Sequence, residues 1–293
     1  MTTTTLARIA VIGATGQQGI SLIDALRGRD IAIRALVRNP DSTAANELRD
    51  SGIEIVKADQ EDAQSVAEGL ADVDALFYMT TFEGPDGTDG EVRRGHMVAD
   101  AAARAGVSHV VYSSVGGAER GTAIPHFDSK YEVEKRLTSV APATILRPTF
   151  FMENLSEQLT PDADGDIVIR LPMPGNIPLQ MISVRDIGRA AARLLLEPGQ
   201  HGNAVEVAGD ELTLDQVAAE VSEVFGIPAR FEPVPLEYLG EDEDLKAMFR
   251  WFAEGDAYQA DLAQSRSLIA DAHDLRSWLF ARREPLVTEG LRE

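Results

Sequence analysis

The sequence predicts an α/β protein in which a doubly wound parallel sheet is followed by a smaller C-terminal α+β lobe. Strand-like apolar runs alternate with helical stretches through residue 150, a pattern typical of a parallel sheet with helices on both faces. A glycine-rich turn joins the first apolar run to the first helical stretch. After Pro148 the alternation becomes irregular. We therefore expect a sheet domain over residues 1–150 and a smaller lobe over residues 151–293 that does not fold independently.

Six strands are expected in the sheet domain, because short apolar runs recur between polar or turn-forming segments. They cover residues 9–12, 31–37, 53–57, 75–79, 107–113 and 143–146. One helix is expected directly after the glycine-rich turn, where Ile20, Ile23 and Leu26 recur at helical spacing. Further helices are expected at residues 41–50, 61–70, 91–105 and about 128–140.

The C-terminal lobe is expected to mix short elements with a loop region. A short helix is expected at residues 151–159 and a strand at 167–171, within a region that contains several prolines. Helices are expected at 186–196, 213–225 and 271–281. Thr213 and Gln216 match a capping box at the start of the second of these, and Gly226 follows its end.

The turn Gly13-Ala14-Thr15-Gly16-Gln17-Gln18-Gly19 has the strand–turn–helix context of a dinucleotide-binding site. Gly13 permits a tight turn, Gly16 lets the backbone approach a pyrophosphate, and Gly19 lets the helix pack close to the sheet. The free amides at the helix start would face the phosphates. An ordinary loop with three glycines is the alternative. The residues assigned to the cofactor here are Gly13, Thr15, Gly16, Gln17, Gln18 and Gly19.

The composition argues against several classes of function. A formal net charge of −21 disfavours direct binding to nucleic acid, although it suits solubility or a basic protein partner. The chain has no cysteine, and its histidines lack metal-ligand spacing, so we expect no metal site. There is no apolar run long enough for a membrane span and no signal-like start, so we expect a cytoplasmic protein without membrane attachment. Oligomers are compatible with this sequence.

The ends of the second, third and fourth predicted strands carry candidate cofactor contacts. Arg38 follows the second strand. At this place an acid would bond a ribose hydroxyl, and an arginine would bind a 2′-phosphate. We therefore expect NADP(H) as the cofactor; the alternative is that Arg38 is simply a solvated side chain. Asp59 and Gln60 follow the third strand, where the carboxylate could meet the adenine or could instead cap the next helix. Met79 and Thr80 end the fourth strand, along the expected path of the ribose and nicotinamide.

Tyr131 and Lys135 match the spacing Tyr-x-x-x-Lys, which is the catalytic pair of the reductase superfamily that this sequence is compared with below. Their positions on the predicted helix argue against this role. Residues of a helix advance about 100° each, so Tyr131 and Lys135 should face away from the apolar stripe. His126 and Lys130 should lie near its centre. The stripe consists of Val133, Leu137 and Val140.

The glycine spacing and the string GATGQQG resemble the NmrA-like family, an atypical branch of the short-chain dehydrogenase/reductase superfamily. The string HFDSKYEVEKRL at residues 126–137 is similar to the same family, as are the segments 112–114, 146–154, 180–187 and 274–279. Extended members of the superfamily carry Tyr-x-x-Ser-Lys-x-x-x-Glu. Ser129, Lys130 and Glu134 match that pattern, and His126 replaces the tyrosine.

This resemblance implies a Rossmann fold that binds NADP(H) through Gly13, Gly16, Gly19, Arg38, Asp59 and Lys130. We add Phe150, from the segment 146–154, to the cofactor residues. Family members include redox sensors that signal through protein partners and reductases that transfer hydride. Without the usual Tyr-Lys pair, redox sensing or regulatory binding is the leading expectation. The alternative is an NADPH-dependent reductase of a quinone, carbonyl or enone, with His126 and Lys130 as the catalytic residues or with proton transfer driven by the substrate.

Overall fold

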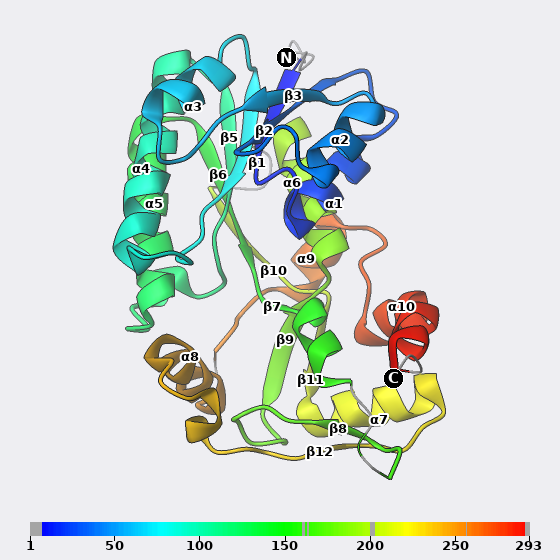
Figure 1. Ribbon diagram of the computed structural model, residues 1–293. Helices are drawn as coiled ribbons and strands as arrows, with labels where there is room; N and C mark the ends of the chain where they lie inside the picture. Colours follow the sequence, from blue (N-terminus) through cyan, green and yellow to red (C-terminus); the bar gives the residue numbers. More distant parts are fainter. Residues whose placement is uncertain (1–7, 160–161, 163, 200–202, 256, 291–293) are drawn as a thin grey trace. The chain divides into compact units, whose positions relative to one another are not determined.

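The computed structural model describes residues 8–159, 162, 164–199, 203–255 and 257–290 (Figure 1). Its chain divides into two compact units. The first contains the described residues of 1–121, 125–147 and 187–205, and the second contains those of 122–124, 148–186 and 206–293. Segment 187–205 therefore groups with the N-terminal unit, whereas a division at residue 150 assigns it to the C-terminal lobe.

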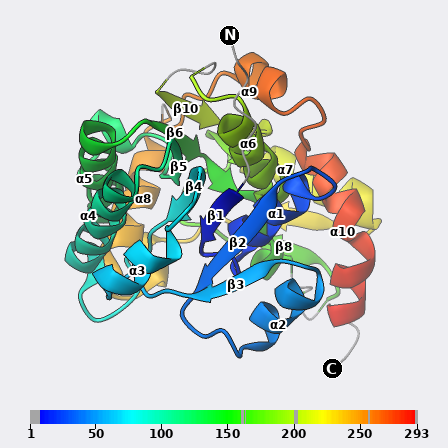
Figure 2. The same cartoon turned by 90° about the horizontal axis from the view of Figure 1, so that it is seen from above.

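A seven-stranded sheet forms the centre of the first unit (Figures 1 and 2). Its strands are β1 (Arg8–Ile12), β2 (Ala32–Val37), β3 (Glu54–Lys57), β4 (Ala75–Met79), β5 (His109–Ser113), β6 (Ala143–Pro148) and β10 (Ala204–Val207). Their order is β10-β6-β5-β4-β1-β2-β3, and strands β1 to β6 pair in parallel. The chain order reverses beside β1. A parallel sheet opens its ligand crevice at such a point, outside the carboxyl ends of the strands.

Helices cover both faces of this sheet, which confirms the predicted fold class (Figure 2). Helices α3, α4 and α5 lie on one face, and α1 and α6 lie on the other. The helices of this unit are α1 (Gln17–Leu26), α2 (Thr43–Asp50), α3 (Ala63–Gly69), α4 (Gly87–Ala105), α5 (Pro125–Val140) and α6 (Val184–Leu196), with a 3₁₀ turn η1 (Ala118–Arg120).

Helices α4 and α5 approach each other closely at Gly95. A Cβ atom at this position would lie 2.3 Å from Cγ2 of Val133, so only glycine allows the observed spacing. Val133 is fully buried in the core that fills this face of the sheet. Glu91 precedes Gly95 by one helical turn, and Ser129 precedes Val133 by one turn. The close approach therefore also brings these two polar residues together.

The second unit has its own apolar core, which includes Phe150, Met181, Val217, Phe252 and Trp278. Its strands form the sheets β11-β9-β7 and β12-β8. No helix in the described part of the chain is long and apolar enough to cross a membrane. The elements are β7 (Phe150–Phe151), η2 (Met152–Gln158), β8 (Ile167–Ile169), β9 (Pro178–Ile182), β11 (Asp210–Thr213), α7 (Leu214–Phe225), β12 (Ala229–Phe231), η3 (Leu236–Leu239), α8 (Glu243–Ala253), α9 (Leu262–Leu268) and α10 (Leu275–Gly290).

All six predicted strands of the main sheet are present, but several other elements differ from expectation. Helix α4 begins at Gly87, not at residue 91 as predicted. The prediction missed its first turn because Gly87 and Gly90 are weak helix formers. The expected helix at 151–159 is the 3₁₀ segment η2. The seventh strand, β10, was not anticipated, and neither were helices α8 and α9.

Substitution of Gly95 by alanine tests the close approach of α4 and α5. Alanine has the higher helix propensity by about 1 kcal/mol, so an uncrowded substitution would stabilise the protein. We expect the free energy of unfolding to fall by about 1–3 kcal/mol instead, because the new methyl group overlaps Val133. Urea denaturation measures this change. The same substitution in a Val133→Ala background should be neutral or stabilising. A Gly95→Ala variant as stable as the unmodified protein would contradict the packing described here.

Candidate functional site

The glycine-rich turn brings helix α1 into backbone contact with the end of β1. Gly13 has a φ of +80°, in the left-handed region that favours glycine, and its carbonyl accepts a hydrogen bond from the Gly16 amide at 3.0 Å. A Cβ atom at Gly19 would lie 2.2 Å from that same carbonyl oxygen. Gly16 is the N-cap of α1, and no described side chain caps this helix end. Its amides are therefore available to an anionic ligand.

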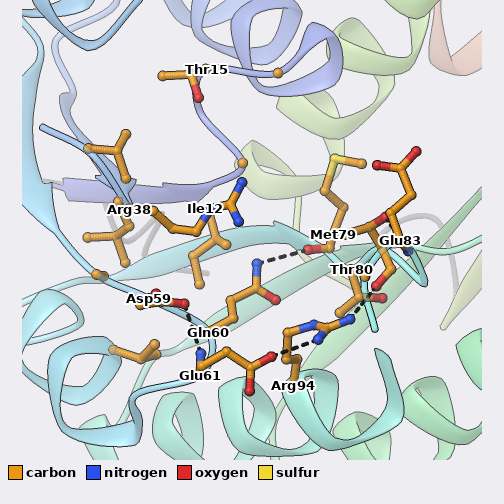
Figure 3. A pocket seen from close by; sticks show the side chains of 18 of the residues that line it. Ile12, Thr15, Arg38, Asp59, Gln60, Glu61, Met79, Thr80, Glu83 and Arg94 are labelled. Atoms are coloured by element: carbon orange, nitrogen blue, oxygen red, sulfur yellow. Dashed lines mark hydrogen bonds and ion pairs between the residues drawn. The ribbon is translucent and has the colours of Figure 1, made fainter. Parts of the chain in front are cut away.

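A pocket of about 440 Å³ lies at the carboxyl ends of strands β1 to β4 (Figure 3). All of its lining residues belong to the first unit, so the pocket is complete within that unit. The lining residues are Ile12, Gly13, Thr15, Gly16, Leu36, Val37, Arg38, Ala58, Asp59, Gln60, Glu61, Val66, Met79, Thr80, Thr81, Glu83, Gly84, Pro85 and Arg94.

Most of the residues that the sequence assigned to a cofactor line this one pocket. They come from four different strand ends, as the crossover topology requires. Those in the pocket are Gly13, Thr15, Gly16, Arg38, Asp59, Gln60, Met79 and Thr80. Those outside its lining are Gln17, Gln18, Gly19, Lys130 and Phe150.

The residues outside the lining have other surroundings. Gln17 is exposed, whereas Gln18 is buried and its Oε1 accepts a hydrogen bond from the Ser113 hydroxyl at 2.7 Å. Gly19 contributes through the backbone contact described above. Phe150 belongs to the second unit, where its ring packs edge-to-face on Phe252 at 6.2 Å between centroids.

Arg38 is exposed and follows directly after β2, with no acidic residue at the strand end. Figure 3 shows its guanidinium extending into the pocket. A guanidinium in this place can bond a phosphate with two parallel hydrogen bonds.

Asp59 and Gln60 lie at the end of β3, where Figure 3 shows both beside the pocket. Asp59 does not cap the following helix: the N-cap of α3 is Asp62, and Asp59 Oδ1 accepts from the Glu61 amide at 3.0 Å. Gln60 Nε2 donates to the carbonyl of Met79 at 3.4 Å. Gln60 Oε1 is buried and has no hydrogen-bond partner among the described residues. A buried acceptor without a partner is costly, so a ligand donor would be favoured there.

An ion pair beside the pocket was not anticipated from the sequence. Arg94 donates to Glu61 Oε1 and to the carbonyl of Thr81, both at 2.7 Å (Figure 3). Arg94, and secondarily Arg93, lowers the pKa of the Glu61 carboxyl below its usual value. The partners are 33 residues apart in the chain, so no local pattern connects them.

Lys130 does not line the pocket, but it is hydrogen-bonded to Thr80, which does. Its Nζ donates to the carbonyl of Thr80 at 3.2 Å and to Glu91 Oε1 at 2.6 Å. His126 is buried, and its ring stacks on Phe82 with 5.0 Å between centroids. Phe82 lies in sequence between the pocket residues Thr81 and Glu83.

The other candidate pair on α5 has a different environment. Lys135 is exposed, as the helical register predicts, whereas Tyr131 is half-buried. Lys135 Nζ lies 5.1 Å from the centre of the Tyr131 ring and 2.5 Å from Glu132 Oε1. Glu134, which matches the extended pattern, binds Arg147 through both carboxylate oxygens, at 3.0 and 2.6 Å.

Two relatives place the chain among oxidoreductases. It is 29% identical over 279 residues to the NmrA-like family domain-containing oxidoreductase FrzB of Cladobotryum sp, with 82% of each chain covered. It is 31% identical over 232 residues to a (4-alkanoyl-5-oxo-2,5-dihydrofuran-3-yl)methyl phosphate reductase of Streptomyces griseus, with 78% of each chain covered.

Solved structures share the same fold. The negative transcriptional regulator NmrA, in complex with NADP, superposes with a TM-score of 0.82 at 22% identity and covers 99% of both chains. The triphenylmethane reductase of Citrobacter sp., complexed with NADP(H), has a TM-score of 0.77 at 25% identity and covers 97% of this chain and 100% of its own. The model of the NmrA-like family matches residues 5–278. The chain thus belongs to the NmrA-like family, whose members bind NAD(P) in a Rossmann fold.

Proposed function

We propose that this protein is an NADPH-dependent reductase of a conjugated carbonyl compound or quinone. The observation that carries the nucleotide part of the proposal is the pocket, which joins a glycine-rich helix start without a side-chain cap among the described residues to Arg38 at the end of β2. The name of the Streptomyces griseus relative supports the reductase part. The helix amides suit a pyrophosphate, and Arg38 suits a 2′-phosphate. The buried, unpartnered Gln60 Oε1 suits a hydrogen-bond donor such as an amino group on a purine. These residues fit the group that the family implies.

The proposed substrate class follows from the need for an electron-poor acceptor of hydride. Bound NADPH would supply a hydride, and an acceptor conjugated to a carbonyl group accepts a hydride readily. The Streptomyces griseus relative reduces a dihydrofuranone that carries an additional acyl group, according to its name. This likeness supports an enone or a related acceptor for the present chain.

His126 is the group we assign to proton donation in this reaction. After hydride addition the acceptor carries an extra negative charge, which one proton neutralises. A histidine can supply this proton near neutral pH. The ring of His126 stacks on Phe82, next in sequence to two residues of the pocket wall. Lys130 is assigned to the cofactor ribose, because its Nζ is bound to the carbonyl of the pocket residue Thr80.

A specific observation favours a second candidate function, redox sensing without turnover. Position 126 carries histidine where extended members of the superfamily carry tyrosine, and Tyr131 pairs with Lys135 rather than with Lys130. A protein with this arrangement could bind NADPH and present the bound form to a protein partner. The two candidates differ in one measurement. Steady NADPH oxidation with quinones, aldehydes or enones supports the reductase, and tight NADPH binding without oxidation supports the sensor.

Cofactor preference tests the role of Arg38. We expect NADPH to bind more tightly than NADH, and Arg38→Ala to reduce this preference tenfold or more. Loss of a charge-assisted hydrogen bond to a phosphate costs about 1.5–3 kcal/mol, which supports an effect of this size. Isothermal titration with both nucleotides measures it. Arg27→Ala, which removes an exposed arginine outside the pocket, is the control and should leave the preference unchanged. Equal affinities of the unmodified protein for NADPH and NADH would contradict the assignment.

Turnover tests the role of His126. In the reductase, His126→Ala should slow NADPH oxidation by roughly 10²-fold, the lower range for loss of a general acid, while the Kd for NADPH stays within about twofold. Stopped-flow absorbance of NADPH follows the reaction. Tyr131→Phe is the matched control on the same helix and should retain full activity. The opposite result, a large loss in Tyr131→Phe with an active His126→Ala, would restore the conventional Tyr-Lys pair.

A further inference from the structure

Glu91 is a fully buried carboxylate on helix α4, and three polar donors bind it. Its Oε1 accepts from the Thr80 hydroxyl at 2.8 Å and from Lys130 Nζ at 2.6 Å. Its Oε2 accepts from the Ser129 hydroxyl at 2.5 Å. These donors come from two other segments, the end of β4 and helix α5. One side chain therefore ties three segments of the first unit together.

A buried charge of this kind needs a physical reason. Transfer of a carboxylate out of water is costly, and a buried ion pair is often no more stabilising than apolar residues of the same volume. Helices α4 and α5 already pack through Gly95 and Val133, one turn further along. The helices thus have an apolar contact that does not involve Glu91. Glu91 is therefore better explained by what it does to Lys130 and Thr80 than by helix packing.

The hydrogen-bond directions around Glu91 are fixed by chemistry. The carboxylate can only accept, so the Thr80 hydroxyl donates to it, and Thr80 Oγ1 in turn accepts from the Tyr112 hydroxyl at 2.8 Å. Burial, followed by the nearby Glu91 charge, raises the pKa of Tyr112 well above its usual value, so this phenol keeps the proton that it donates. The hydrogen bonds from Tyr112 through Thr80 to Glu91 therefore run in one direction.

This arrangement holds the ammonium group of Lys130 from two sides. Both of its contacts lead to the pocket wall, one directly to the Thr80 carbonyl and one through Glu91 to the Thr80 hydroxyl. An ammonium group has three N–H donors, and the described residues bind two of them, so one remains for a ligand. Its direction is set once the other two are bonded.

We propose that Glu91 is the positioning residue of the cofactor site: it orients Lys130 toward the nucleotide. This inference rests on the proposed function, because it takes Lys130 as a contact to the cofactor ribose. It predicts that Glu91 acts on binding only through Lys130. A merely structural ion pair would act on stability and leave binding unchanged.

A double-mutant cycle separates these two roles. We expect Glu91→Gln to raise the Kd for NADPH roughly tenfold, within the range of couplings between contacting residues, and Lys130→Met to raise it by a similar factor. The double variant should bind no more weakly than Lys130→Met alone. NADPH fluorescence titration gives the Kd values, and thermal melting gives the stability of each variant.

Glu134→Gln is the matched control. Glu134 is, like Glu91, a buried carboxylate with a cationic partner. It lies on α5, the helix of Lys130, but it binds Arg147 rather than Lys130. This variant should melt at a lower temperature and retain its Kd within about twofold.

Each outcome leads to a decision. If the unmodified protein binds no NADPH, the proposed function is wrong. If it binds NADPH while Glu91→Gln binds equally well, or if the effects of Glu91→Gln and Lys130→Met on binding simply add, the positioning role is wrong. Should Glu91→Gln fail to melt cooperatively, Glu91→Asp decides instead. Its side chain is one methylene shorter, so we expect its contact to Lys130 to weaken and the affinity for NADPH to fall. Unchanged affinity would overturn the inference.

Discussion

Helix α1 can lie against the turn after β1 only because residue 19 has no side chain. Any Cβ atom there would lie 2.2 Å from the carbonyl oxygen of Gly13 and would push the helix away. The contact directs the uncapped helix start toward the carboxyl ends of the parallel strands. The pocket depends on this placement, and so do the cofactor contacts that we propose for it. The same backbone contact explains why Gly19 matters without lining the pocket itself.

The charge of the pocket differs from that of the chain as a whole. A protein with a net charge of −21 repels phosphates at long range, so an anionic nucleotide requires cations at the site itself. Arg38 extends into the pocket, while Arg94 is bound to Glu61 and to the Thr81 carbonyl. Arg38 is thus the better placed of the two to bind a phosphate. This distribution is compatible with both candidate functions, because a reductase and a sensor need the same nucleotide contacts.

The two candidate functions, reductase and sensor, differ in what they require of the residues on helix α5. Its register presents His126 and Lys130 to the core side and leaves Lys135 exposed beside Tyr131. Glu91 on α4 then holds the lysine, since its two donors from α5, Ser129 and Lys130, lie one turn from the close approach of the helices at Gly95. The missing side chain at position 95 and the buried charge at position 91 are therefore parts of one arrangement. Glycine permits the approach, and the carboxylate determines how the lysine is held.

The sequence by itself determined the fold class, the six parallel strands and the glycine-rich turn, because each depends on local periodicity or on a short motif. It also predicted that Arg38, Asp59, Gln60 and Met79 lie in one region, since the carboxyl ends of parallel strands meet at the same edge of a sheet. Only the tertiary structure decided that Lys130 binds Glu91, 39 residues away in the chain. The same holds for Arg94 and Glu61, which are 33 residues apart. It also decided that β10 joins the sheet. Such contacts depend on how helices and strands pack, and no spacing within the chain encodes them.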